Sequence, residues 1–448
     1  MRRNDRFHGM GLKVNKINDY PLWSIAAALI LVYLSPFVSP YLCYAAFVIC
    51  ICRVIAYSPQ IFIGDCVLLL PLAQLFSTPD GMSLQVYLYL FAAIWYLLHG
   101  SVRANSSIVW LLLLMIYMIA RMQLAIAPYL LSFGPVLLMF VLMPQQDSKT
   151  AVRTAKLFCY GVILSSVYAL VLRNTWQLEQ VLGAEAPAIW GTNIMRFRGL
   201  IRDPNYYMTL LVITLGLMLK LRDSRHVSLL NFWLIAVPAV IFGILTYSKT
   251  FLLVAILMTG FYILWQFGSR KVIWGCVLTG LSVLGLMFLL LWEGSPLAVV
   301  LSRLGSANSL DELTTGRTVV FADYLEVIFH DPLSVLFGQG LAAEGLVKDP
   351  HNLYIEIMYY LGAVGLVLYV GLFVAMLRSI HRSTSGIDRS NFFSRYIVLF
   401  LVLILFMSLH GMFQLITVGS FMMAYLAILI TKKQDDVPVR TEGETEEI

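Results

Sequence analysis

The stretch Asp349–Gly365, DPHNLYIEIMYYLGAVG, marks the point where a long polar segment gives way to an apolar run. The segment before it, residues 293–350, carries charged side chains such as Asp311, Glu312 and Arg317. Such a segment is unusual in a chain that is 60% hydrophobic and only 12% charged. We therefore expect polar chemistry to be concentrated at this junction, and the rest of the chain to form the scaffold that holds it.

The composition indicates an integral membrane protein. A soluble protein carries about 25% charged residues, whereas this chain of 448 residues carries 12% and has a mean hydropathy of +0.81. The net charge of +6 does not indicate a nucleic-acid partner, because the basic residues follow the loops of a membrane protein. All six cysteines lie in apolar runs without a CxxC pattern, so we expect no disulfide framework.

Apolar runs long enough to cross a bilayer recur along the chain. Because a transmembrane helix needs about 20 mostly apolar residues, we predict an all-α polytopic membrane protein with about 12–14 transmembrane helices. The candidate spans are 21–38, 40–56, 61–77, 84–99, 107–120, 122–143, 157–172, 205–219, 229–246, 250–267, 272–292, 352–377, 396–409 and 411–430. The weakest divisions are at Arg121 and near His410.

The basic residues orient these spans. With a cytoplasmic N-terminus, 22 of the 31 Lys and Arg residues fall on the inner side and the short loops alternate as the positive-inside rule requires. The predicted organisation is a cytoplasmic N-terminus (1–20), a transmembrane bundle (21–292) with an outer loop at 173–204, a long extracytoplasmic loop (293–351), C-terminal transmembrane helices (352–430) and a cytoplasmic tail (431–448).

The basic residues on the outer side run against this bias. They are Arg121, Arg173, Arg196, Arg198, Arg202, Lys249, Arg303, Arg317 and Lys348. Guanidinium groups match phosphate oxygens in bidentate fashion, so one interpretation is an anion site at the outer face. The other is that these residues pair with Asp203, Asp311, Glu312 or lipid phosphates. Composition alone leaves both open.

Two local patterns predict helices near these residues. Asp203-Pro204-Asn205 has the residue types of a helix N-terminus, so we expect it to start the helix over 206–219. Residues Thr318–Phe329 predict an amphipathic helix on the membrane surface. Its expected apolar stripe consists of Val319, Val320, Tyr324, Val327 and Ile328.

His351 is the candidate for proton transfer. It follows Asp349 and directly precedes a helix start, and a histidine there can act as a general base near neutral pH. The competing interpretation is a histidine at the boundary between water and lipid. Glu356 lies five residues later within a predicted span. Because inserting such an acid into a membrane costs about 2.5–3.5 kcal/mol, we expect Glu356 to face the same cavity as His351. Asp65, near the inner end of its span, is expected to be solvated.

Lys249, in TYSKT, lies at the outer end between two apolar runs, on the side of the predicted anion site. Tyr247 and Lys249 could instead be interfacial anchors. The sequence contains no HExxH, P-loop or GxSxG motif, and no DxD motif in an outer loop. We therefore predict neither a metal site nor a cofactor.

Four motifs together resemble the O-antigen polymerase and ligase superfamily. They are RFRGLIRDPN (196–205), TYSKT (246–250), GRTVVFADYLEVIFHDPLSVLFGQGL (316–341) and HNLYIEIMYYLGAVGLVLY (351–369). Each motif is loose by itself, but their order and membrane side are those of the family. The N-terminal half is similar only as a membrane bundle.

The resemblance implies a metal-independent, inverting glycosyltransferase with a GT-C-like bundle, acting on undecaprenyl-diphosphate-linked oligosaccharides at the outer leaflet. By resemblance, Arg196 and Arg317 bind the diphosphate of the donor, and His351 activates the acceptor hydroxyl. Lys249 stands where the family more often has Arg, and Asp203 replaces a common Asn. Arg198, Asn205, Asn352 and Glu356 are expected to support the site.

The predicted activity is that of a Wzy-type polysaccharide polymerase, which transfers a growing glycan to a lipid-linked repeat unit. One alternative is a ligase that transfers the glycan to lipid A core, teichoic acid or protein, and a more distant one is a transporter of lipid-linked oligosaccharides. The resemblance also implies the plasma (inner) membrane of a bacterium, an outward-facing active site, membrane lipids as partners, and a chain-length regulator and flippase acting beside this protein.

Overall fold

The computed structural model describes residues 21–100, 106–121, 126–143, 146–182, 195–266, 299, 316–341, 343, 346, 349–383, 392–409, 411–412 and 414–431. The predicted cytoplasmic N-terminus, the predicted span 272–292, His410 and nearly all of the predicted cytoplasmic tail lie outside these residues.

Within the described ranges the regular elements are helices, apart from an isolated bridge between Ser77 and Ser83. The helices are α1 (Leu22–Leu34), α2 (Leu42–Ala56), α3 (Pro59–Leu69), the 3₁₀ helix η1 (Leu70–Leu72), α4 (Leu84–Leu98), α5 (Ser106–Arg121), α6 (Ile126–Leu142), α7 (Ser148–Leu172), α8 (Trp176–Leu182), α9 (Pro204–Asp223), α10 (Leu229–Leu245), α11 (Lys249–Gln266), α15 (Arg317–Phe329), α16 (Pro332–Phe337), α17 (Leu353–Ser383), α18 (Phe392–Leu405) and α19 (Leu415–Leu429). The all-α prediction is confirmed for this part of the chain.

The helices have the character of membrane segments. Among the described residues, three are long and apolar enough to cross a bilayer: α7, α9 and the part of α17 over Leu353–Ser379. Ten further apolar helices are 10–17 residues long, shorter than the roughly 20 residues of a full span. Large apolar side chains face outward on the peripheral helices; Trp23, Leu98 and Val171 are 76%, 78% and 74% exposed. A surface of this kind suits lipid and not water.

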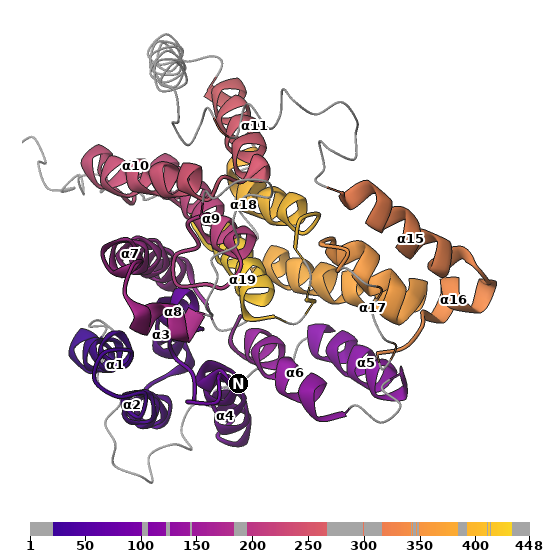
Figure 1. Ribbon diagram of the computed structural model, residues 1–448, viewed down its shortest axis with the longest axis horizontal. Coiled ribbons are helices and arrows are strands. Elements are labelled where there is room, and N and C mark those ends of the chain that lie inside the picture. The colour runs from indigo at the N-terminus through magenta and orange to yellow at the C-terminus, as the bar shows by residue number, and fades with distance from the viewer. Residues whose placement is uncertain are drawn as a thin grey trace, which may run out of the picture.

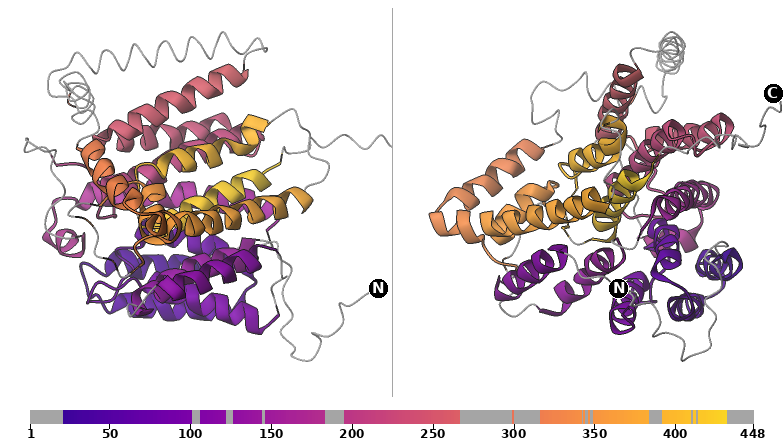
Figure 2. Two further views of the ribbon diagram at one scale, coloured as in Figure 1. Left: turned by 90° about the vertical axis from the view of Figure 1, so that its right-hand side faces the viewer. Right: turned by 180° about the vertical axis from the view of Figure 1, so that it is seen from behind.

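The centre of the bundle is formed by α9 and α19, whose side chains are almost all buried. α9 packs against α7, α10, α18 and α19 (Figure 1). The neighbouring helices run roughly side by side, with α15 and α16 at one end of the bundle (Figure 2, left). Because the centre is apolar, the charged motifs are confined to the helix ends and the connections between them.

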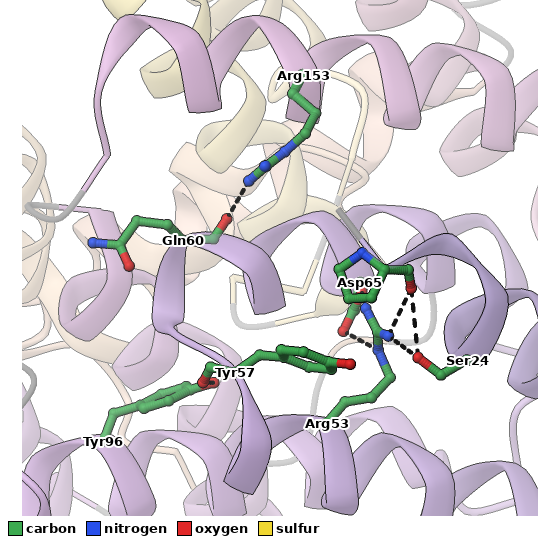
Figure 3. A network of polar contacts seen from close by, with 8 residues as sticks. Ser24, Arg53, Tyr57, Gln60, Asp65, Tyr96 and Arg153 are labelled. Carbon is green, nitrogen blue, oxygen red and sulfur yellow. Dashed lines mark hydrogen bonds and ion pairs between the residues drawn. The ribbon is translucent and has the colours of Figure 1, made fainter. Parts of the chain in front are cut away.

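One charged pair is buried between α1, α2 and α3. The Arg53 guanidinium forms an ion pair with Asp65, with Nη2 2.7 Å from Oδ1, and both side chains are at most 2% exposed. Arg53 also donates to the Pro21 carbonyl at 3.0 Å and to the Ser24 hydroxyl (Figure 3). The expectation that Asp65 is solvated is wrong. A carboxylate at this depth is tolerated because a guanidinium on the preceding helix, α2, neutralises it.

α15, α16 and α17 lie together beside α5 at one side of the molecule (Figure 1). The predicted amphipathic helix is confirmed as α15. Tyr324 and Ile328 are buried against Tyr359 of α17, as the predicted stripe requires, but Val319 is 55% exposed. The short helices α8 and α16 were not predicted, because each is only one to two turns long.

α17 is not a continuous helix. Gly362 has φ +64° and ψ −168°, so the helix stops and restarts there. The residues of the break are held by the turn 338–340, which follows α16. The first segment of α17, from Leu353 to Leu361, is therefore a short helix that places His351 at one end and the break at the other.

Candidate functional site

The first motif, RFRGLIRDPN, leads into α9. Asp203 is the N-cap, and its Oδ1 accepts a hydrogen bond from the Asn205 amide at 2.6 Å, with Pro204 at the first helical position. This confirms the predicted cap, in which proline loses no hydrogen bond because its nitrogen would have had no helical partner. The motif thus ends in a rigid helix start.

The backbone of this motif folds back onto α10. The Phe197 amide donates to the Leu245 carbonyl at 2.9 Å, and the Phe197 ring stacks on Phe242 with centroids 5.5 Å apart. Gly199 has φ +57° and lies against the Tyr207 ring, where a β-carbon would clash. A glycine is required at this position for both reasons.

Arg196 joins three separate pieces of chain. Its Nε donates to the Thr246 carbonyl at 2.8 Å, and its Nη2 donates to Asn205 Oδ1 at 3.2 Å. The first contact reaches the TYSKT turn between α10 and α11, and the second reaches the start of α9. The structure therefore brings together two of the predicted motifs, and it gives Asn205 a direct role in holding Arg196.

The TYSKT turn presents Lys249 at the start of α11. Tyr247 has φ +52°, a strained conformation for a residue other than glycine, and the Ser248 hydroxyl accepts from the Phe251 amide at 3.3 Å. Lys249 is the first residue of α11. A cation at a helix N-terminus is opposed by the helix dipole, so helix stability does not account for this lysine.

Arg173 lies near the same turn. Burial raises the pKa of the Tyr247 hydroxyl, and the Arg173 charge partly opposes this. Arg173 follows the last residue of α7 and is exposed. Sequence reasoning placed it on the outer side but did not assign it to the site, because it belongs to none of the four motifs.

Arg317 comes to the same region from far along the chain. It is the first residue of α15, after Gly316, whose φ is +79°. Burial lowers the pKa of the Arg317 guanidinium, while the negative charge of Asp203 raises it. Arg317 and the Asp203 cap of α9 are therefore within electrostatic reach of each other. Both interpretations of the outer basic residues keep support. Asp203 is an acid near Arg317, as pairing with acids requires, while Arg196 and Lys249 add the positive charge that an anion site requires.

Arg198 has a different position. It is 8% exposed, and its Nη1 donates to the carbonyl of Leu182, the last residue of α8, at 3.3 Å. Burial, followed by the nearby Arg202 charge, lowers the pKa of the Arg198 guanidinium. This side chain ties α8 to the motif.

His351 precedes α17 in a strained conformation. Its φ is +43°, in the left-handed region that residues other than glycine rarely adopt. The next residue, Asn352, is the cap: its Oδ1 accepts from the amides of Tyr354 and Ile355 at 3.0 and 3.2 Å. The Leu353 amide donates to the Phe406 carbonyl at 2.9 Å, which fixes the junction against the end of α18.

Glu356 is directed toward the connection between α18 and α19. Its Oε2 accepts a hydrogen bond from the Gly411 amide at 2.5 Å. Sequence reasoning singled out this acid for its depth, but it did not identify a backbone amide as its partner. Glu356 thus supports the segment that begins at His351 by holding a neighbouring connection in place.

The site residues form two groups, one at the start of α9 with Arg196 and Asp203, and one at the start of α17 with His351 and Asn352. α15 connects these two groups. Arg317, at its start, is near Asp203, while Tyr324 packs on Tyr359 of α17 with ring centroids 4.9 Å apart. Burial raises the pKa of the Tyr324 hydroxyl, and the Asp349 charge adds to this effect, so Tyr324 also lies near the residues before α17. At 1.5 Å per residue, Arg317 and Tyr324 are separated by about 10 Å along the helix.

A cavity of about 430 Å³ opens between α15 and α16. Six of its eight lining residues are polar; the lining consists of Asp323, Glu326, Val327, His330, Asp331, Ser334, Gln339 and Leu346. Carboxylates and amides of this kind can bind sugar hydroxyl groups. Among the residues that the structure describes, no group of three His, Cys, Asp or Glu side chains is arranged to hold a metal ion.

Comparison of the chain with protein-family models, curated proteins and solved structures gave no match.

Proposed function

We propose that this protein is an integral-membrane glycosyltransferase with a GT-C-like bundle of about 12–14 transmembrane helices. It polymerises a polysaccharide by transferring a growing glycan from undecaprenyl diphosphate to a lipid-linked repeat unit at the outer leaflet. The observation that carries this proposal is that Arg196 bonds both the TYSKT turn and Asn205 at the start of α9, with Arg317 within electrostatic range of the Asp203 cap of the same helix.

These basic residues suit a diphosphate. Arg196 and Arg317 offer guanidinium groups that match phosphate oxygens, and Lys249 adds a third positive charge. Cleavage of the bond between the sugar and the diphosphate leaves negative charge on the departing group. Cations that are held in place before the reaction stabilise that charge in the transition state.

His351 supplies the base on the acceptor side. The acceptor hydroxyl attacks the anomeric carbon of the donor from the face opposite the diphosphate and transfers its proton to His351. A glycosidic bond forms, the bond to the diphosphate oxygen breaks, and undecaprenyl diphosphate leaves with its electron pair. This displacement inverts the anomeric centre. The polar cavity beside α15 is available to the hydroxyl groups of the acceptor unit.

The test uses purified protein, native lipid-linked repeat units and EDTA, with products separated on a gel. Wild type is compared with His351→Ala and with a control, His99→Ala, which changes an exposed histidine at the opposite end of α4 from the outer loops. We expect a ladder of chain lengths from wild type and from the control, and none from His351→Ala.

Other outcomes would contradict the proposal. A product formed only when lipid A core, teichoic acid or protein is added would identify a ligase instead of a polymerase. No product with any acceptor would remove the glycosyltransferase proposal and favour transport of the lipid-linked unit. A full ladder from His351→Ala would remove His351 as the base.

A further inference from the structure

The break in α17 is matched to the turn that follows α16. Gly338 has φ +69° and Gly362 has φ +64°. A β-carbon on Gly338 would lie 2.6 Å from the Gly362 nitrogen, and one on Gly362 would lie 2.5 Å from the Gly338 nitrogen. The two backbones are therefore in direct contact, and neither position has room for a side chain.

Three carbonyl groups at the break lose their helical partners and obtain others. The Tyr359 carbonyl accepts from the Gln339 amide at 2.7 Å, and the Tyr360 carbonyl accepts from the Gly340 amide at 3.0 Å. The Leu361 carbonyl accepts from the Tyr117 hydroxyl of α5 at 2.8 Å. A buried carbonyl without a partner is costly, so these bonds join the turn, α17 and α5 into one unit.

Arg121, the last residue of α5, holds the turn from the other side. Its Nη2 donates to the Gly338 carbonyl at 2.7 Å, and its own carbonyl accepts from the Leu341 amide at 3.0 Å. One residue thus contacts both ends of the turn, with its side chain on one end and its backbone on the other. Only the first of these contacts depends on the side chain, so it can be removed by substitution.

This turn lies between the two groups of site residues. The hairpin of α15 and α16 ends in this turn and has Arg317 at its other end. The first segment of α17, which the turn holds, begins just after His351. α16 and α15 also pack on α17. Whatever fixes the turn on the break therefore fixes the helix of Arg317 relative to the helix of His351.

We propose that Arg121 is a positioning residue. It clamps the Gly338–Gly340 turn onto the break in α17 and thereby fixes the distance between Arg317 and His351 that catalysis requires. The assignment of a catalytic purpose to this clamp rests on the proposed glycosyltransferase function. The clamp itself is a structural claim that can be measured without activity.

The structural arm measures distances between two spin labels by pulsed electron paramagnetic resonance. The labels are placed at Val319→Cys, which is exposed on α15, and at Met407→Cys, which is exposed beside the Phe406 carbonyl that binds Leu353. The background is Cys52→Ser and Cys276→Ser. We expect one narrow distance distribution for the wild type and a distribution at least twice as broad for Arg121→Ala.

Two further variants serve as comparisons. Arg121→Lys keeps a donor for the Gly338 carbonyl and should restore the narrow distribution. Arg153→Ala is the matched control, because it removes a bond from an arginine Nη2 to a backbone carbonyl, that of Gln60, at 2.9 Å, away from the clamp (Figure 3). It should leave the distribution unchanged. An unchanged distribution in Arg121→Ala would overturn the clamp.

The activity arm measures kcat and KM for the donor with the same variants. We expect kcat of Arg121→Ala to fall at least tenfold, with KM changed less than about threefold, and Arg121→Lys to recover most of the rate, because one charge-assisted hydrogen bond is lost in the first and kept in the second. A broadened distribution with an unchanged kcat would overturn the positioning role. If wild type itself forms no product, the proposed function fails, and the distances alone decide whether the clamp exists.

Discussion

At the scale of single residues, Arg196 is held by hydrogen bonds to two different parts of the chain. It donates to the Thr246 carbonyl and to Asn205 Oδ1, and these two bonds fix the orientation of its planar group. A lysine has one ammonium group on a flexible stem and cannot reproduce this fork. The exchange of Arg for Lys is therefore informative at this position.

We expect Arg196→Ala to lower the polymerisation rate about 100-fold and Arg196→Lys about 10-fold, since hydrogen bonds to charged groups contribute about 1.5–3 kcal/mol and about 1.4 kcal/mol changes a rate tenfold. Rates are measured from the initial slope of product formation. Arg202→Ala is the control, because Arg202 is an exposed arginine of the same motif. Equal losses in Arg196→Ala and Arg202→Ala would show that the motif contributes only general positive charge.

Sequence reasoning worked for residues whose role is local. Asp203 was predictable as a cap because its partner, the Asn205 amide, is two residues away. The partners of Asp65 and Glu356 are Arg53 and the Gly411 amide, 12 and 55 residues away. Both acids lie within predicted spans, but their partners depend on how the helices pack, and no local pattern encodes that.

At the scale of helices, the runs of apolar residues located most elements, because a lipid-facing or buried helix needs such a run. The amphipathic stripe located α15 in the same way. The break in α17 was missed because Gly362 and Gly365 resemble the small residues of tightly packed membrane helices. What distinguishes Gly362 is its contact with Gly338, which lies 24 residues earlier in the chain.

The break leads to a prediction about stability. Gly362→Ala places a β-carbon in a left-handed conformation and against the backbone of the turn after α16, with the nearest atom 2.5 Å away. Gly81→Ala is the matched control: Gly81 also has positive φ, +81°, but no atom lies within 4 Å of its β-carbon position. Backbone strain opposes both variants, more strongly at Gly362, because φ +64° with ψ −168° is a region that essentially only glycine occupies, and only Gly362→Ala adds the clash.

The apparent unfolding midpoint of the purified protein, followed by intrinsic fluorescence on heating, separates the two effects. We expect Gly81→Ala to lower the midpoint by a few degrees, and Gly362→Ala to lower it further, with a total cost above about 3 kcal/mol. Similar shifts for the two variants would mean that the turn moves away freely, and the close contact between Gly338 and Gly362 would then contribute little to stability.

At the scale of the whole molecule, the loops predicted for each side of the membrane meet at a common end. On the predicted inner side, the His226 Nε2 lies 2.8 Å from the Thr431 carbonyl oxygen, and the Ser148 hydroxyl is 2.9 Å from that of Thr431. On the predicted outer side, the Arg121 Nη2 donates to the Gly338 carbonyl at 2.7 Å. These contacts join loops that the count of basic residues had assigned to one side independently of the fold.

This agreement predicts which ends of the bundle a membrane-impermeant maleimide can reach. In intact, right-side-out vesicles, cysteines at Asp80 and Val319 should be labelled, and cysteines at His99 and Ser228 should be labelled only after the membrane is opened; all four positions are exposed in the structure. The background Cys52→Ser and Cys276→Ser removes the reactivity of the native thiols at residues 52 and 276.

Because Val319 lies two residues from Arg317, the same experiment tests on which side of the membrane Arg317 and the cations near it lie. Labelling of His99→Cys and Ser228→Cys in intact vesicles would show that the protein has the opposite orientation in the membrane. Arg196, Lys249 and Arg317 would then face the cytoplasm, where a donor at the outer leaflet cannot reach them.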